Sequence, residues 1–203
     1  MELAVVTCPE YFEAEGELIN DFFDAGLEVL HIRKPDQERV QFTTLMSEIR
    51  PEFYPRIAIH QHHDLAKEFG LRRLHFTEQQ RKAQSAGKLH ELAVAGYRLS
   101  SSVHQVDTFV GLEEFSYVFF GPVFDSISKQ GYKSKLKEGF VLPPHKLKVF
   151  AIGGAHAGRF GEINRMNFDG AAVLGSLWHT DVPPLRALTI MMNEIKSLNN
   201  GDR

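Results

Sequence analysis

The sequence lacks the features that mark disulfide-bonded and membrane-spanning proteins. Cys8 is the only cysteine among 203 residues, so no intrachain disulfide can form. The longest apolar runs, such as 117–120 and 149–152, are far shorter than a membrane span, and no basic segment followed by an apolar core begins the chain. These absences predict a cytoplasmic protein that has no membrane partner.

An excess of positive charge is also absent. Lys and Arg number 23 and Asp and Glu number 26, which gives a formal net charge of -3. Proteins that bind nucleic acid neutralise its phosphates with a basic surface, so we expect no nucleic-acid partner. A hydrophobic content of 43% is enough for one contiguous core, and no Pro/Gly/Ser-rich linker divides the chain. Residues 1–203 are therefore predicted to form a single domain.

Short apolar runs recur along the whole chain. Runs that are apolar at nearly every position are typical of parallel strands, which are covered on both faces. The eight runs are 3–7, 29–33, 57–60, 73–76, 98–102, 117–120, 149–152 and 171–174. Each is predicted to be a strand.

Helical patterns lie between most of these runs. Segment 17–25 places Leu18, Ile19, Phe22 and Phe23 on one face, and segment 37–49 carries Val40, Phe42, Leu45, Met46 and Ile49 at comparable spacing. Three glycines, Gly26, Gly70 and Gly96, each follow a helical stretch and precede a strand, where a left-handed cap favours glycine. Strand and helix therefore alternate.

This alternation fits either a doubly wound open sheet or a barrel. A barrel gathers residues from many strand ends into one mouth, whereas an open sheet binds ligands at one switch point. Polar clusters follow nearly every apolar run, at 31–34, 60–63, 75–78, 100–104, 125–129 and 175–176. The sequence therefore predicts an α/β fold, a single (β/α)8 TIM barrel with short helices.

Two glycine-bearing turns follow the last two predicted strands. Gly153 with Gly154, and Gly175 with Ser176, each open a helical stretch. Glycine lets backbone N–H groups approach an anion closely, and barrels often bind phosphate at this place. We expect these four residues to bind phosphate. Segment 125–148, which is rich in lysine, fits both a solvated loop and a lid that closes on phosphate.

The segment from Phe120 to Lys129 reads F-G-P-V-F-D-S-I-S-K. It resembles F-G-P-I-F-x-T-x-T-K of the thiamine-phosphate synthase family, which also contains the TenI thiazole tautomerases. The resemblance runs nearly end to end and includes segments 149–155 and 169–177. It implies that Ser126, Ser128 and Lys129 bind the phosphate or diphosphate of a substrate.

The synthases of this family join a pyrimidine diphosphate to a thiazole phosphate with Mg²⁺, held by two aspartates. Gln61 and Gln80 occupy these two positions here. Magnesium prefers anionic oxygen ligands, so the exchange weakens the metal site. Glu78 and Asp64 are the carboxylates that could substitute. No metal ligand is therefore assigned.

After the second predicted strand the synthases carry Q-x-R-x-K, whereas this chain has His31, Arg33 and Lys34 followed by proline. Histidine at the first position resembles the tautomerase branch. We expect these three residues to contact substrate, together with His60 and Ser102 at the mouth of the barrel.

His104 ends the motif S-S-S-V-H, which resembles the family's G-x-S-x-H. In the tautomerases this histidine moves a proton on the thiazole ring without a metal cofactor, and imidazole titrates in the suitable range. Our leading hypothesis is a metal-independent thiazole tautomerase with His104 as acid and base. A divergent Mg²⁺-dependent thiamine-phosphate synthase and a non-catalytic phosphate binder remain alternatives, and a homo-oligomer remains open.

Four histidines, His60, His62, His63 and His75, also raise the hypothesis of a zinc site. The alternation of side chains along a strand disfavours it, because neighbouring histidines point in different directions. His62 and His63 are predicted to face solvent, whereas His60 and His75 are predicted to line the mouth.

Overall fold

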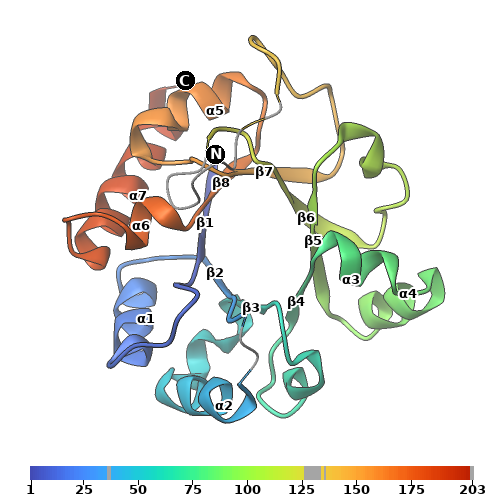
Figure 1. Cartoon of the computed structure of the whole chain (residues 1–203), viewed down its shortest axis with the longest axis vertical. Coiled ribbons are helices and arrows are strands. Elements are labelled where there is room, and N and C mark those ends of the chain that lie inside the picture. The colour runs from blue at the N-terminus through green and yellow to red at the C-terminus, as the bar shows by residue number, and fades with distance from the viewer. Residues whose placement is uncertain (36–37, 126–133, 135, 202–203) are drawn as a thin grey trace.

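Eight parallel strands close into a barrel in the computed structural model, which describes residues 1–35, 38–125, 134 and 136–201 (Figure 1). The strands follow one another around the barrel in chain order. They are β1 (Glu2–Val6), β2 (Val29–Ile32), β3 (Ile57–Ile59), β4 (Arg73–Phe76), β5 (Arg98–Val103), β6 (Phe115–Phe120), β7 (Lys148–Ile152) and β8 (Gly170–Val173). The predicted (β/α)8 barrel is confirmed, and each predicted strand overlaps an observed one.

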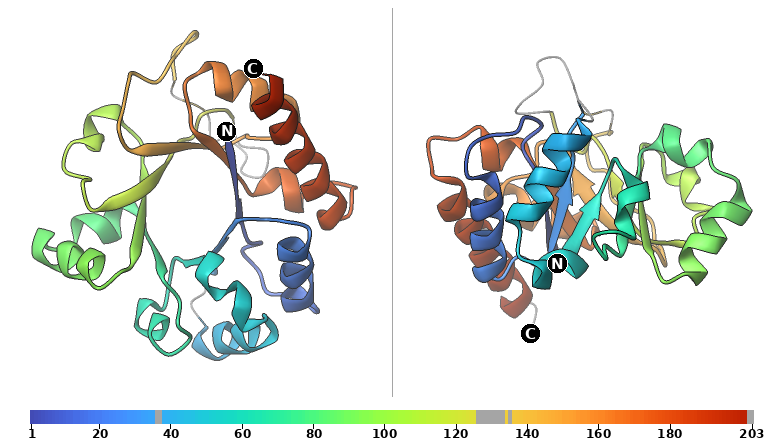
Figure 2. Two further views of the ribbon diagram at one scale, coloured as in Figure 1. Left: turned by 180° about the vertical axis from the view of Figure 1, so that it is seen from behind. Right: turned by 90° about the horizontal axis from the view of Figure 1, so that it is seen from below.

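Helices and short 3-10 turns cover the outside of the barrel (Figures 1 and 2). The helices are α1 (Glu15–Asp24), α2 (Arg39–Glu48), α3 (Glu78–Lys82), α4 (Ala86–Val94), α5 (Phe160–Arg165), α6 (Gly175–Trp178) and α7 (Pro184–Gly201). The 3-10 turns are η1 (Pro51–Arg56), η2 (His63–Ala66), η3 (Val106–Phe109) and η4 (Ala157–Arg159). Within the described residues, no helix combines the length and apolar character that a membrane crossing requires.

The apolar face of α1 agrees with the prediction, but that of α2 differs at one residue. In α1, Ile19, Phe22 and Phe23 are buried. In α2, Phe42 is fully buried, whereas Val40 is 74% exposed. Residues two apart lie on nearly opposite sides of a helix, so Val40 and Phe42 cannot share one face. The prediction for Val40 was therefore wrong.

The three glycines that precede strands adopt the left-handed conformation that the sequence indicates. The φ angles are +103° at Gly26, +68° at Gly70 and +85° at Gly96. Residues with a Cβ rarely adopt such angles, so glycine can end each preceding turn without steric strain.

The interior of the barrel is divided into an apolar and a polar part. The apolar part contains Ala4, Val6, Tyr117, Phe119, Phe150 and Ala172, from β1, β6, β7 and β8. On β2, β4 and β5 the inward positions are instead taken by His31, His75 and Ser100, each fully buried. Buried polar groups need hydrogen-bond partners, and these residues find them within the barrel.

A buried ion pair joins the first residue of α1, Glu15, to Lys34 in the loop after β2. The Lys34 ammonium donates to both carboxylate oxygens of Glu15 at 2.7 Å, and both side chains are 1% exposed. It also donates to the carbonyls of Cys8 and Glu10. Burial raises the pKa of the Glu15 carboxyl, and the hydrogen bond from Lys34 opposes this rise. This placement does not agree with the substrate-binding role predicted for Lys34, because its donors are already used.

Replacing Lys34 with methionine should destabilise the protein strongly. Lys34→Met leaves the buried Glu15 carboxylate without its counter-charge, so the free energy of unfolding should fall by about 3–5 kcal/mol. Urea denaturation at neutral pH measures this change. Asp64→Asn is the control, because it removes the exposed partner of Arg39 and should cost no more than about 1 kcal/mol. Similar small losses of unfolding free energy in both variants would show that the buried ion pair stabilises the protein no more than an exposed one.

Candidate active site

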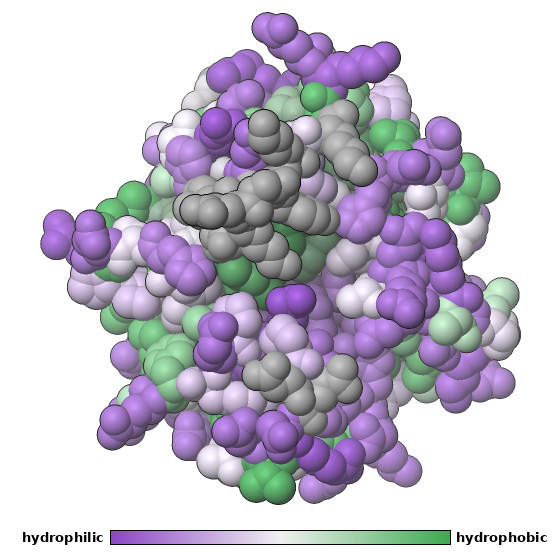
Figure 3. All heavy atoms as spheres, in the orientation of Figure 1, coloured by the Kyte–Doolittle hydropathy of each residue, from purple (hydrophilic) through white to green (hydrophobic). Residues whose placement is uncertain are grey.

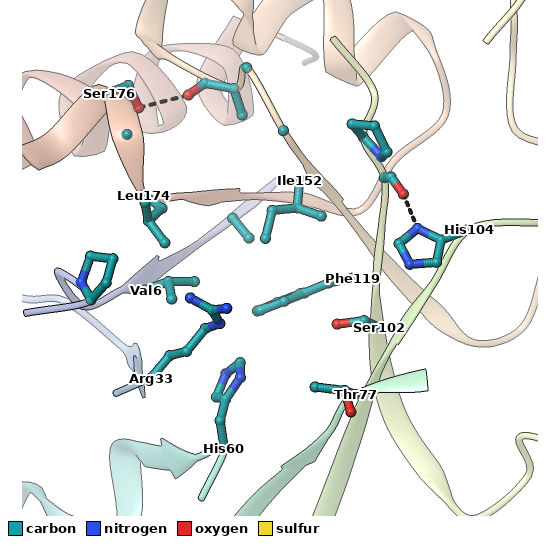
Figure 4. A pocket seen from close by; sticks show the side chains of 18 of the residues that line it. Val6, Arg33, His60, Thr77, Ser102, His104, Phe119, Ile152, Leu174 and Ser176 are labelled. Atoms are coloured by element: carbon teal, nitrogen blue, oxygen red, sulfur yellow. Dashed lines mark hydrogen bonds between the residues drawn. The ribbon is translucent and has the colours of Figure 1, made fainter. Parts of the chain in front are cut away.

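A cavity of about 440 Å³ opens at the carboxyl ends of the strands, where barrels place their active sites. Every strand, or the loop that follows it, contributes to the wall. Seen from the face shown in Figure 3, the rim is mainly hydrophilic and hydrophobic side chains lie deeper near the centre. The predicted site residues in the wall are Arg33, His60, Ser102, His104, Gly153, Gly154, Gly175 and Ser176 (Figure 4).

The other predicted residues lie elsewhere. His31 is fully buried below the cavity floor, so it can reach a ligand only through its neighbours. Lys34 points away from the cavity toward Glu15. Ser126, Ser128 and Lys129 lie outside the described residues, as does part of the predicted lid segment.

Arg33 projects toward the middle of the cavity (Figure 4). Its backbone is fixed by Thr7 at the end of β1, because the Arg33 N–H donates to the Thr7 hydroxyl at 3.0 Å. Among the described residues of the wall, Arg33 is the one lysine or arginine. A guanidinium in this position suits an anionic ligand, since it can form two parallel hydrogen bonds with a phosphate or carboxylate.

Three imidazoles form the floor of the cavity and the layer beneath it. His31 Nδ1 lies 3.1 Å from His60 Nε2, and the rings of His60 and His75 stack with centroids 4.0 Å apart. His75 Nδ1 contacts Ser100, and His75 Nε2 contacts Ser102. Burial lowers the pKa of all three imidazoles, that of His75 to about 3. The three rings are therefore neutral at physiological pH.

His104 stands at the side of the cavity, directly after β5. Its Nδ1 forms a short hydrogen bond with the Gly121 carbonyl, which can only accept, so Nδ1 carries the proton. The other nitrogen, Nε2, holds the lone pair whenever the ring is neutral, and it lies 3.8 Å from a carboxylate oxygen of Glu78. The hydrogen bond from Lys82 lowers the pKa of Glu78, and His104 adds a smaller effect. Glu78 is thus an anion that can stabilise a protonated His104.

The two glycine-bearing turns face the cavity side by side. Gly153 and Gly154 have φ angles of +93° and +64°, and a Cβ on Gly154 would lie 2.7 Å from the Phe124 Cβ. The Ser176 hydroxyl donates to the Ala155 carbonyl at 2.7 Å and so ties the turn after β8 to the turn after β7. Small residues let the backbone of both turns approach a ligand closely.

The positions at which synthases hold magnesium are occupied by amides with structural roles. The Gln61 side-chain oxygen accepts from the Lys34 N–H at 3.0 Å. Gln80 caps α3 by accepting from the Thr77 N–H at 2.8 Å, and its amide nitrogen donates to the His60 carbonyl. Neither amide is free for a cation, so these residues do not fit magnesium.

The two carboxylates that could substitute are also engaged. Asp64 pairs with Arg39 at 2.6 Å and lies in the exposed part of the surface. Glu78 pairs with Lys82 at 2.6 Å. Neither is among the described residues that line the cavity.

Sequence reasoning missed Thr77 and misplaced three histidines. Thr77 lines the cavity, and its spacing of two from the inward-facing His75 was the available signal. His75 lies beneath the mouth rather than in its wall. His62 and His63 were predicted to face solvent. The His62 ring instead packs against Phe42 and its Nε2 is buried, and the His63 Nε2 contacts the carbonyls of Ile59 and His75.

Solved structures share this fold at low sequence identity. A thiamine phosphate pyrophosphorylase from Bacteroides thetaiotaomicron is 24% identical, with a TM-score of 0.72 over 97% of this chain and 98% of that one. A thiamine phosphate pyrophosphorylase from Pyrococcus furiosus is 16% identical, with a TM-score of 0.78 over 97% and 96%. A 3-hexulose-6-phosphate synthase from Salmonella typhimurium is 14% identical, with a TM-score of 0.63 over 96% and 100%. These similarities establish the fold alone.

Comparison with curated proteins gave no match. The family model described as thiamine monophosphate synthase matches residues 3–177, which cover all eight strands of the barrel apart from Glu2 of β1, and both glycine-bearing turns. The match confirms the resemblance seen in the sequence motifs, and the chain belongs to the thiamine monophosphate synthase (TMP-TENI) family.

Proposed function

We propose that the protein acts in thiamine biosynthesis as a magnesium-independent thiazole tautomerase, with His104 as acid and base. The observation that carries this proposal is the geometry of His104, whose Nδ1 is fixed on the Gly121 carbonyl and whose Nε2 faces the Glu78 carboxylate. A neutral imidazole in a fixed tautomer can accept one proton and return it.

The proposed substrate is a carboxythiazole phosphate. Its phosphate binds the backbone of the turns at Gly153 and Gly175, and Arg33 faces its anionic groups from the floor. His104 Nε2 takes a proton from the ring and returns it to another ring atom, which gives the aromatic tautomer. The number of protons is unchanged, and Glu78 stabilises the transient imidazolium.

Replacing His104 should abolish most of the turnover. In His104→Gln we expect kcat for ring aromatisation to fall roughly 10²–10⁴-fold, because the group that transfers the proton is lost. Glu78→Gln should have a smaller effect, since Glu78 only stabilises the protonated form. His90→Gln, on the surface beside Glu114, is the matched control and should retain full activity. Unchanged turnover in His104→Gln would leave a non-catalytic phosphate binder as the better interpretation.

Replacing Arg33 should weaken binding more than catalysis. In Arg33→Met we expect KM to rise about 10–100-fold with little change in kcat, because a charged hydrogen bond contributes about 1.5–3 kcal/mol to ligand binding. Arg33→Lys should recover only part of this loss, since an ammonium cannot form the paired hydrogen bonds of a guanidinium. Steady-state kinetics on the thiazole phosphate measures both constants. A drop in kcat at unchanged KM would contradict the proposed role.

The second candidate is a magnesium-dependent thiamine-phosphate synthase, which the family description favours. A paired assay separates the two. Pyrimidine diphosphate and thiazole phosphate are supplied with and without Mg²⁺, and the carboxythiazole tautomer is supplied separately. Because Gln61 and Gln80 are engaged in backbone hydrogen bonds, we expect no thiamine phosphate in either condition, and we expect aromatisation in the presence of EDTA. Magnesium-dependent formation of thiamine phosphate would overturn the tautomerase proposal.

A further inference from the structure

The imidazoles of His31, His60 and His75 converge in the barrel. They come from β2, the end of β3 and β4, and all three side chains are buried. One ring nitrogen from each lies within 4.8 Å of the other two. The proton-transfer role proposed for His104 does not use any of them.

One pair of these nitrogens is spaced much as two ligands of one metal ion are. His31 Nδ1 and His60 Nε2 are 3.1 Å apart. Two nitrogens bound to a tetrahedral metal at about 2.0–2.1 Å lie roughly 3.3 Å from each other. A small movement of these two rings would therefore give the separation that a shared cation requires.

The hydrogen bonds of the second ring nitrogens of His31 and His75 suit the tautomers that such a cation needs. A His31 protonated at Nε2 can donate to the Tyr117 hydroxyl, 2.7 Å away, which leaves the lone pair on Nδ1. A His75 protonated at Nδ1 can donate to the Ser100 hydroxyl, 2.9 Å away, which leaves the lone pair on Nε2. Metal-binding histidines commonly have such a partner on the second nitrogen.

The cluster also has access to the cavity. His60 and Ser102 line the cavity floor, and the Ser102 hydroxyl is 3.0 Å from His75 Nε2. A cation held by the three nitrogens would keep a coordination position open toward the cavity. Three protein ligands with one open position are typical of catalytic zinc sites.

We propose that His31, His60 and His75 form a site for a divalent transition-metal ion such as Zn²⁺ or Co²⁺. The donor set consists of nitrogen alone, which suits these ions and not magnesium or calcium. The site lies below the cavity floor and is separate from the positions of Gln61 and Gln80. It goes beyond the proposed tautomerisation and does not depend on it.

Two features of the surroundings determine how the ion binds. The His60 and His75 rings are stacked, so one ring must tilt for both lone pairs to point at one ion. Arg33 acts on His60 and His75, and Arg73 acts on His31. These positive charges oppose a bare dication and favour an anion, such as hydroxide or a substrate oxygen, at the open position.

Cobalt titration of the untagged, full-length protein tests the site. After treatment with EDTA, Co²⁺ is added and the visible ligand-field bands are followed, with Zn²⁺ as the competitor and without substrate. We expect one equivalent of Co²⁺ to bind with bands typical of four or five ligands, and Zn²⁺ to displace it. In His31→Gln and in His75→Gln the affinity should fall at least about 100-fold, and in Tyr117→Phe by about 10–100-fold. His90→Gln should bind as the unmodified protein does.

Absence of the bands, or equal binding in His75→Gln and the unmodified protein, would overturn the proposal. Circular dichroism shows whether each variant is folded. X-ray absorption at the zinc edge on the unmodified protein gives a test that needs no variant: three imidazole nitrogens are expected, whereas carboxylate or sulfur ligands would place the ion elsewhere. Aromatisation by the EDTA-treated protein is measured in parallel, so that failure of the metal site and failure of the proposed function are distinguished.

Discussion

The candidate site depends on one close contact between two backbone segments, 121–125 and 152–154. The Val123 N–H donates to the Ile152 carbonyl at 2.9 Å, and the Phe124 N–H donates to the Gly153 carbonyl at 3.1 Å. A Cβ on Gly121 would lie only 2.1 Å from the Ile152 carbonyl oxygen, so the contact requires glycine there. The same contact places the Gly121 carbonyl beside His104 and packs the glycine turn after β7 against residues 122–125. The proton-transfer group and the anion-binding backbone are thus positioned by a single arrangement of the chain.

The fold could be predicted because its signal is local and repeated. A strand of a closed barrel is covered on both faces, so it reads as a short apolar run, and each of the eight runs became a strand. The buried faces of the helices were predicted less accurately. A short helix has few turns, so one apolar residue on the exposed side changes the apparent pattern. Segment 37–49 shows this: Phe42 and Met46 set the buried face of α2, and Val40 is apolar but exposed.

The site was predicted less completely than the fold, because the direction of a side chain depends on distant partners. Arg33 and Lys34 are neighbours, and alternation allows only one of them to face the cavity. The choice is made by Glu15, which lies 19 residues away and holds Lys34 on the outer side. The sequence shows two cations after β2, but it does not show that one has a buried counter-charge. The convergence of His31 and His75 likewise depends on barrel closure, which brings alternate strands together.

Amides stand at the two positions that the family resemblance assigns to metal-binding aspartates, and both are tied to the backbone near the floor of the barrel. The Gln80 side chain donates to the His60 carbonyl. Gln61, which directly follows His60, accepts from the Lys34 N–H. The positions that would hold magnesium in a synthase therefore support the backbone around His60. A carboxylate at position 80 could not donate this hydrogen bond, so it would leave the His60 carbonyl without this partner. The two amides are therefore linked by hydrogen bonds to the segment that carries the His60 imidazole at the floor of the cavity.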